Sequence, residues 1–415
     1  MLDYIFILII LLFLIPILYV RIRYPFWSTQ PVFHTYDIFR YLAQTPYEIH
    51  SSVYSKTHKK DNNIKTISFL EMSNPRMVDL VQFIQNHLVE SENVLTLIDK
   101  DNLHNILTGQ FYRSYVSIYE KEKYSIVHGE NGEISIQNTP QIIGCMTSRG
   151  INMFILDKSD KMHEKTGYLW DYITIHREHI QYNIGRKMIQ SHDIHQRTHT
   201  KDISISLFRK EIELCEGVVP LVKYKVYSFI MSKIRRPRLQ TPYSVNRIYN
   251  DNVDILYDYL YNITHNTTTN TMKFVAFPDI ANLDILIKTN IVIVYVLKCG
   301  EVLCGIYIFR NPMMCYDKIN EGNVLECSES LYTIQGQDIH PIFFAGFLHA
   351  LHDIQKSFAS KYKILTFHNL GHNYYIIERW KWKYVPLSVN DAAYYLYNAV
   401  IPNMPIDQSE CVIIM

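Results

Sequence analysis

Apolar and polar residues recur along the chain with spacings that predict both helices and strands. The segment NPRMVDLVQFIQNHLVE places apolar residues three and four positions apart, which predicts an amphipathic helix. The runs ILTGQFYRSYVSIYE and PQIIGCMTSRGINMFIL are β-branched, aromatic and separated by turn residues, so we expect successive strands there. The next segment predicts a strand at Leu169–Ile175, a short polar turn and a helix from about Ile184.

The second half of the chain repeats this order of elements. It predicts helices at Val253–Thr264 and Ile342–Ser357, with strands in ILIKTNIVIVYVLKCG, VLCGIYIF, YKILTFHN and AAYYLYNAV. The basic segment 232–242, SKIRRPRLQTP, contains two prolines and cannot continue a regular element, so we expect a linker there. The pattern favours an α/β fold with two related halves, 24–231 and 243–415, each a mixed sheet flanked by helices.

Residues 1–23 differ from the rest of the chain. The stretch 2–20 is almost entirely apolar and has about the 20 residues that a helix needs to cross a bilayer. Arg21 and Arg23 follow it and nothing basic precedes it, which predicts a single-pass anchor with the remainder in the cytoplasm. The alternative is a buried core helix.

Charge and cysteine content exclude several classes of protein. The chain carries 41 basic and 40 acidic residues, so no strong field favours nucleic acid. Its seven cysteines form no C-x-x-C pair, which disfavours a zinc ribbon and fits a reducing compartment. His192, His195 and His199 recur at helical spacing, but no cysteine or carboxylate set accompanies them. We therefore expect a solvated helix face and no metal.

The segment IHREHIQYNIGRKMI carries the clearest chemistry. Where a strand gives way to a helix, free backbone N–H groups and the positive helix end can hold a phosphate. Gln181, Asn183, Ile184 and Gly185 match part of the signature that acetyltransferases use for the pyrophosphate of CoA. An ordinary strand-to-helix turn is the alternative, because a single glycine also serves close packing.

Three separated stretches together resemble the N-myristoyltransferase family. They are FWSTQPV, YITIHREHIQYNIGRKMI and YYLYNAVIPNMPIDQSECVIIM, and they occur in the family's order across residues 24–415. The resemblance implies two fused acetyltransferase-like (GNAT) halves. It also implies transfer of a long acyl chain, myristoyl, from acyl-CoA to the N-terminal glycine of a protein, with no permanently bound cofactor. We expect a monomer.

The resemblance assigns roles to individual residues. The carboxylate of Met415 would take the proton from the glycine amine, and the backbone N–H groups of Tyr172 and Ile173 would form the oxyanion hole. Asp171 and Tyr395 would contact the peptide. The acyl-CoA would contact Tyr24, Phe26, Trp27, Ile173, Thr174, Ile175, Gln181, Asn183, Ile184 and Gly185.

The sequence departs from the family pattern at several of these places. Ser388, Val389 and Asn390 replace Gly-Asp-Gly and remove an acid, and Asp171 stands where the family has asparagine. Tyr182 takes the place of a basic residue in the phosphate loop. The alternatives are therefore an acyltransferase with a different donor, or a non-catalytic module that binds acyl-CoA or a lipopeptide at a membrane.

Overall fold

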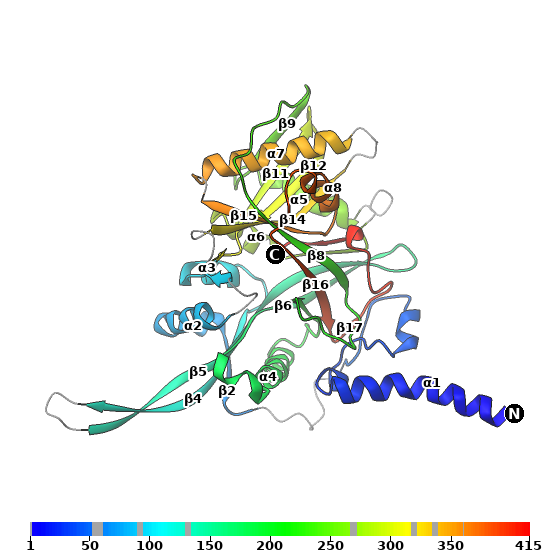
Figure 1. The fold of residues 1–415 in the computed structure, drawn as a ribbon, viewed down its shortest axis with the longest axis vertical. Coiled ribbons are helices and arrows are strands. Elements are labelled where there is room, and N and C mark those ends of the chain that lie inside the picture. The colour runs from blue at the N-terminus through cyan, green and yellow to red at the C-terminus, as the bar shows by residue number, and fades with distance from the viewer. Residues whose placement is uncertain are drawn as a thin grey trace.

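One large mixed sheet runs through the molecule, with helices packed against it (Figure 1). A computed structural model describes residues 2–51, 61–88, 94–128, 134–265, 272–316, 322–333, 339–359 and 361–415. The helices are α1 (Leu2–Arg23), α2 (Asn74–His87), α3 (Lys100–Leu107), α4 (Ile184–His199), α5 (Asp254–His265), α6 (Ile280–Lys288), α7 (Ile339–Ser357) and α8 (Asn373–Lys381).

The strands belong to this sheet apart from one small pair, β1 and β17. The first nine strands are β1 (Tyr47–Glu48), β2 (Ile64–Ser68), β3 (Val94–Thr96), β4 (Tyr115–His128), β5 (Ile134–Leu156), β6 (Met162–Ile175), β7 (Ser206–Glu211), β8 (Val222–Ile230) and β9 (Tyr243–Ile248). The others are β10 (Phe274–Phe277), β11 (Val292–Cys299), β12 (Val302–Arg310), β13 (Met314–Tyr316), β14 (Gly322–Tyr332), β15 (Tyr362–His368), β16 (Ser388–Tyr397), β17 (Ala399–Val400) and β18 (Cys411–Ile413).

The two halves of the chain exchange strands. The order across the sheet is β18-β10-β5-β6-β7-β16-β8-β15-β14-β12-β11-β9. Strand β16 of the second half therefore lies between β7 and β8 of the first, while β10 and β18 join the first half at β5. The predicted linker has no regular structure across 232–242, but the boundary it marks in sequence is not a boundary in space.

The strongly periodic segments form the predicted elements. The helices α2, α4, α5 and α7 lie where the pattern places them, and β6 ends at Ile175 as predicted. The prediction for ILIKTNIVIVYVLKCG was partly wrong: its first residues complete α6, and β11 begins only at Val292. Thr289, Asn290 and the backbone bond from the Ile291 N–H to the Leu286 carbonyl end that helix.

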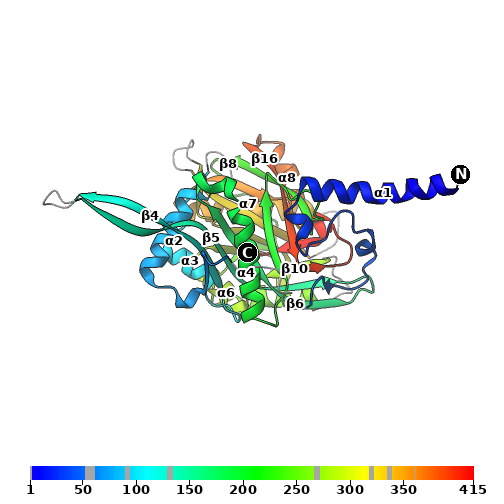
Figure 2. The same cartoon turned by 90° about the horizontal axis from the view of Figure 1, so that it is seen from below.

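The apolar N-terminal segment forms α1, which extends away from the rest of the molecule (Figure 2). Among the residues that the structure describes, no helix is both long and apolar enough to span a bilayer.

An aromatic cluster fixes α7 and α8 against the sheet. Trp380 of α8 is 1% exposed and its ring lies against Phe229, Phe347, Phe367 and Tyr384, with centroid separations between 4.8 and 6.4 Å. Burial of a ring of this size is among the largest stabilising contributions that one side chain can make.

Trp380→Ala should lower the free energy of unfolding by about 3–5 kcal/mol, because it leaves a cavity among packed rings. Trp382→Ala is the matched control, since Trp382 lies two residues away and is 85% exposed; it should change stability by no more than about 0.5 kcal/mol. Urea denaturation of both variants makes the measurement. Equal losses would contradict the packing described here.

Candidate active site

A bulge interrupts the pairing of β5 and β6 at Tyr172. Thr147 pairs with Asp171 and Cys145 pairs with Thr174, so two residues of β6, Tyr172 and Ile173, stand opposite one residue of β5. Tyr172 also has a positive φ of 49°. Bulges turn backbone groups out of the ladder, and here the bulged residues are those predicted to supply the oxyanion hole.

The N–H of Tyr172 already has an acceptor. It donates to Oδ1 of the adjacent Asp171 at 2.9 Å. The Tyr172 carbonyl is turned the other way, where it accepts from Oγ1 of Thr174 at 3.2 Å. Asp171 thus occupies one of the two predicted donors.

The end of the chain is buried beside this bulge. Residues 411–414 are each at most 2% exposed, and β18 pairs in parallel with β10. Met415 lines the same pocket as Asp171 and Tyr172, and the Tyr394 hydroxyl lies 3.7 Å from its Sδ. The predicted burial of the tail is therefore present in the structure.

A buried carboxyl group holds the other edge of β18. Glu329 of β14 is 0% exposed, and its Oε1 accepts the Ile413 N–H at 3.0 Å. Burial raises the pKa of Glu329 well above its usual value, with the Ile413 bond opposing, so the group is neutral where it contacts the tail. On this edge of β18 the Glu329 side chain therefore accepts the N–H that a neighbouring strand would accept in a continuous sheet.

The same strand supplies a second buried acid with the opposite character. Burial opposes ionisation of Glu326, but His368, Arg310 and Arg209 together lower its pKa to about 2. Burial and Arg209 push His368 toward its neutral form, so the two arginines carry the countercharge. The nearest Arg310 and Glu326 atoms are 3.9 Å apart.

A bulge in β14 places both acids on one face. Ile308 pairs with Glu329 and Arg310 pairs with Glu326, so the register between β12 and β14 shifts at Ser328. Without the extra residue, side chains three positions apart would point to opposite faces. One strand thereby delivers an ionised group to the pocket and a neutral one to the tail.

Residues from these elements line one pocket. Its lining comes from β3, β6, β7, β12, β13, β14 and the chain end, and it includes Leu169, Trp170, Asp171, Tyr172, Arg209, Arg310, Met314, Glu326 and Met415. A second pocket shares Arg209, Glu326 and Met314 with it and extends toward Glu211, Ser228 and Asn390. The shared residues place the two pockets next to each other, and we call the two together the groove.

The predicted phosphate turn follows β6 directly. The chain passes through the 3₁₀ helix η4 (Arg177–Tyr182), and Asn183 then adopts a left-handed conformation and α4 begins at Ile184. A Cβ at Gly185 would lie 2.8 Å from Cδ1 of Ile175, so the helix start is close to the strand. The side chain of Gln181 lies outside the described set.

Two basic residues at the start of α4 have different partners. Lys187 is held by Asp61 at 3.1 Å, whereas the Arg186 guanidinium lies 5.5 Å from the centre of the Phe26 ring. Trp27 stacks on Phe208 with ring centroids 5.5 Å apart. The N-terminal aromatics therefore lie next to the phosphate turn.

Tyr24 and Tyr395 lie elsewhere. Tyr24 lies against Tyr19 and Gly217 at the base of α1. Tyr395 points to the opposite face of β16 from Tyr394; its hydroxyl accepts the Cys215 N–H at 3.0 Å. Tyr395 does not line the groove.

The histidine face of α4 is partly buried, contrary to the prediction. His192 is 0% exposed and its Nδ1 lies 2.7 Å from the Ser117 hydroxyl. Burial lowers the pKa of His192 to about 3, so the ring is neutral. No group of three metal-ligating side chains occurs among the described residues.

Sequence reasoning missed the arginines and acids of the groove. Arg209, Arg310 and Glu326 come from three separate strands and form no motif. The available signal was a charged residue inside an apolar run, as in GIYIFR and NVLECSESLY, because such residues are rarely buried without a partner.

Comparison with solved structures establishes the fold. No protein-family model and no curated protein matches this sequence. Saccharomyces cerevisiae N-myristoyltransferase with bound myristoyl-CoA superimposes with a TM-score of 0.65 and 10% identity, covering 94% of this chain and 99% of that one. A second structure of that enzyme, with myristoyl-CoA and inhibitors, gives 0.64 and 10%, covering 92% and 91%. The chain therefore has the α/β fold of N-myristoyltransferase, as the three stretches predicted.

The two acids should give stability opposite dependences on pH. The raised pKa of Glu329 means that its contribution is complete below its unfolded value of about 4.5 and is lost as pH rises through the folded value, by at most about 1.4 kcal/mol per pH unit. Glu329→Gln should abolish that loss, because an amide does not titrate. The fold should persist, since the amide oxygen still accepts the Ile413 N–H.

Glu326→Gln is the matched control. The lowered pKa of Glu326 makes its contribution complete above about pH 4.5 and lost as pH falls toward 2. Urea denaturation across about pH 2–9 separates the two variants. Identical pH profiles for wild type and Glu329→Gln would show that Glu329 is ionised in the folded protein.

Proposed function

We propose that this protein transfers a long-chain acyl group, myristoyl, from acyl-CoA to the amine of an N-terminal glycine. The observation that supports it is the convergence of Met415, the bulge at Tyr172–Ile173 and a charged groove in one pocket. Similarity of fold to an enzyme whose structure contains myristoyl-CoA adds to this.

The donor would lie along β6. The free N–H groups at the start of α4 and the Arg186 side chain would hold the pyrophosphate, and Phe26 and Trp27 would cover the adjoining part of the molecule. Ile173, Thr174 and Ile175 would run beside the pantetheine arm. Acyl-CoA is the co-substrate, and the reaction needs no resident cofactor.

The charges of the pocket suit an incoming amine. With its α-carboxylate turned into the pocket, Met415 would join Asp171 and Glu326 as a third negative charge, against two positive charges from Arg209 and Arg310. One excess negative charge attracts a protonated amine. An α-amine has a pKa near 8, so a carboxylate can remove its proton at modest cost.

The amine would then attack the thioester carbonyl directly. A C–N bond forms as the C–S bond breaks, CoA leaves as a thiolate that takes up a proton, and no acyl-enzyme intermediate is required. The developing oxyanion would accept from the Ile173 N–H and from the Tyr172 N–H, which Asp171 must release.

That last requirement supports one alternative. A carboxylate held on the Tyr172 amide would disfavour an oxyanion, which suits a module that binds acyl-CoA or a lipopeptide without turnover. Turnover distinguishes the two functions.

The full chain should add an acyl group to a peptide that begins with glycine. Incubation with acyl-CoAs of 8 to 18 carbons, followed by mass measurement of the peptide, makes the test. Removal of residues 411–415 should abolish transfer, since it removes the proposed base and the strand that positions it. Binding of acyl-CoA with no mass gain from any donor would leave the binding module as the function.

Asp171→Asn tests which group is the base. The amide oxygen can still accept the Tyr172 N–H, so the bulge should persist and kcat should change by less than about tenfold if the Met415 carboxylate takes the proton. A loss of more than 100-fold, with KM for acyl-CoA unchanged, would instead make Asp171 the base.

A further inference from the structure

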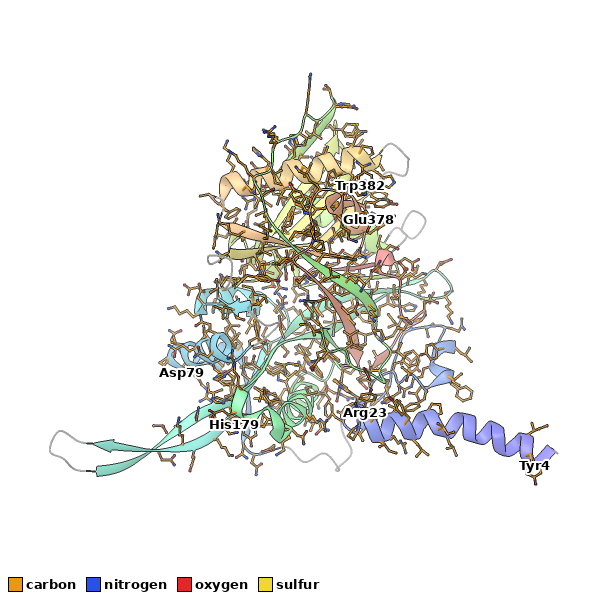
Figure 3. The ribbon with its side chains drawn as sticks, viewed as in Figure 1. Tyr4, Arg23, Asp79, His179, Glu378 and Trp382 are labelled. Carbon is orange, nitrogen blue, oxygen red and sulfur yellow. The ribbon has the colours of Figure 1, made fainter. Side chains whose placement is uncertain are left out.

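An exposed loop and the strand after it present apolar side chains to solvent beyond α8. Trp382 is 85% exposed and Val385 is 88% exposed, and Leu387 and Val389 are exposed by 44% and 45%. Figure 3 marks Trp382 close to Glu378 of α8. Isolated exposed apolar residues are common, but four within eight positions, including a tryptophan, form a patch that calls for a partner.

Basic side chains lie in the same loop and in two neighbouring segments. Lys381 and Lys383 flank Trp382, and Lys223 and Lys225 project from β8. The extended linker adds Lys233, Arg235, Arg236 and Arg238, which are all exposed. We call these eight residues, together with Trp382, Val385, Leu387 and Val389, the basic apolar face.

The linker and the loop are in contact. The Ser232 hydroxyl lies 3.0 Å from the Tyr384 hydroxyl, and the linker follows α7 through bonds to Gln355 and His349. Two carboxylates, Glu378 and Asp391, pair with members of the face. The eight cations outnumber the two anions that pair with them, which gives a local positive excess in a chain whose net charge is +1.

The face lies on the reverse of the strands that line the groove. On β8, Val226 and Ser228 face the groove whereas Lys225 faces the other way, and on β16 the same alternation separates Asn390 from Val389. In Figure 2, β8, β16 and α8 lie along one side of the molecule. A partner bound there would not block the groove.

We propose that the basic apolar face binds the surface of a membrane rich in anionic lipid. Lysine and arginine near an anionic bilayer each add attraction, and tryptophan is favoured at the depth of the headgroups. An exposed tryptophan and an exposed valine in a loop that carries Lys381 and Lys383 and contacts the basic linker match both properties. A soluble nucleic acid would use the cations alone and would leave Val385 and Leu387 without a role.

Trp382 is itself the probe. The other tryptophans are buried or half-buried: Trp170 and Trp380 are 3% and 1% exposed, and Trp27 stacks on Phe208. With the full chain and vesicles containing 30% phosphatidylserine, bromine on the acyl chains should quench Trp382 emission. Trp382→Phe should remove the quenched component. Since α1 also exposes apolar side chains, quenching is needed as well as binding to assign the contact to this face.

Charge reversal is a second test of the proposal. One variant combines Lys233→Glu, Arg235→Glu, Arg238→Glu and Lys383→Glu. Its affinity for the anionic vesicles, measured by co-sedimentation, should fall by roughly 100-fold or more. The matched control reverses four exposed lysines elsewhere, Lys100, Lys121, Lys201 and Lys288, and should retain most of the binding. Both variants should keep wild-type thermal unfolding.

Two results would overturn the proposal. One is vesicle binding that leaves Trp382 emission unquenched and that the two charge variants weaken equally, since the contact would then lie elsewhere. The other is tight binding of a 20-nucleotide single strand through the same four cations with no binding to the vesicles, which would assign the face to a soluble polyanion.

Discussion

The fold depends on the chain end being held inside the sheet. Residues 411–413 complete an edge next to β10, and the neutral Glu329 carboxyl group accepts the Ile413 N–H. A tail of five residues buries little apolar area of its own to offset the conformational entropy that it loses on folding. The bond from a buried side chain, together with full burial of Val412 and Ile414, fixes Met415 beside the bulge.

The same region shows how irregular backbone creates chemistry on a regular scaffold. The bulge at Tyr172 takes two residues of β6 out of the ladder with β5, and the bulge at Ser328 brings Glu326 and Glu329 to one face of β14. Each adds a single residue to a strand. The first produces candidate donors for an oxyanion, and the second separates a charged pocket group from an uncharged structural one.

Much of the local structure could be predicted from sequence, and much of the site could not. The helix from Ile184 and the turn at Asn183–Gly185 follow from periodicity and from a glycine against Ile175. The position of β16 between β7 and β8 does not, because strand order depends on contacts between residues more than 150 positions apart. The arginines of the groove share that origin. The partner of Lys187 shares it too, because its ion pair with Asp61 joins two segments that lie far apart in the sequence.

The central claim is that the carboxylate of Met415 lies at a fixed place in the groove and acts as the base. Extending the chain by one glycine after Met415 moves that carboxylate by about one residue length while leaving β18 and the bulge intact. We expect acyl-CoA binding, measured by calorimetry, to be unchanged and kcat for glycine-led peptides to fall at least 100-fold. Unchanged kcat in the extended chain would contradict the account.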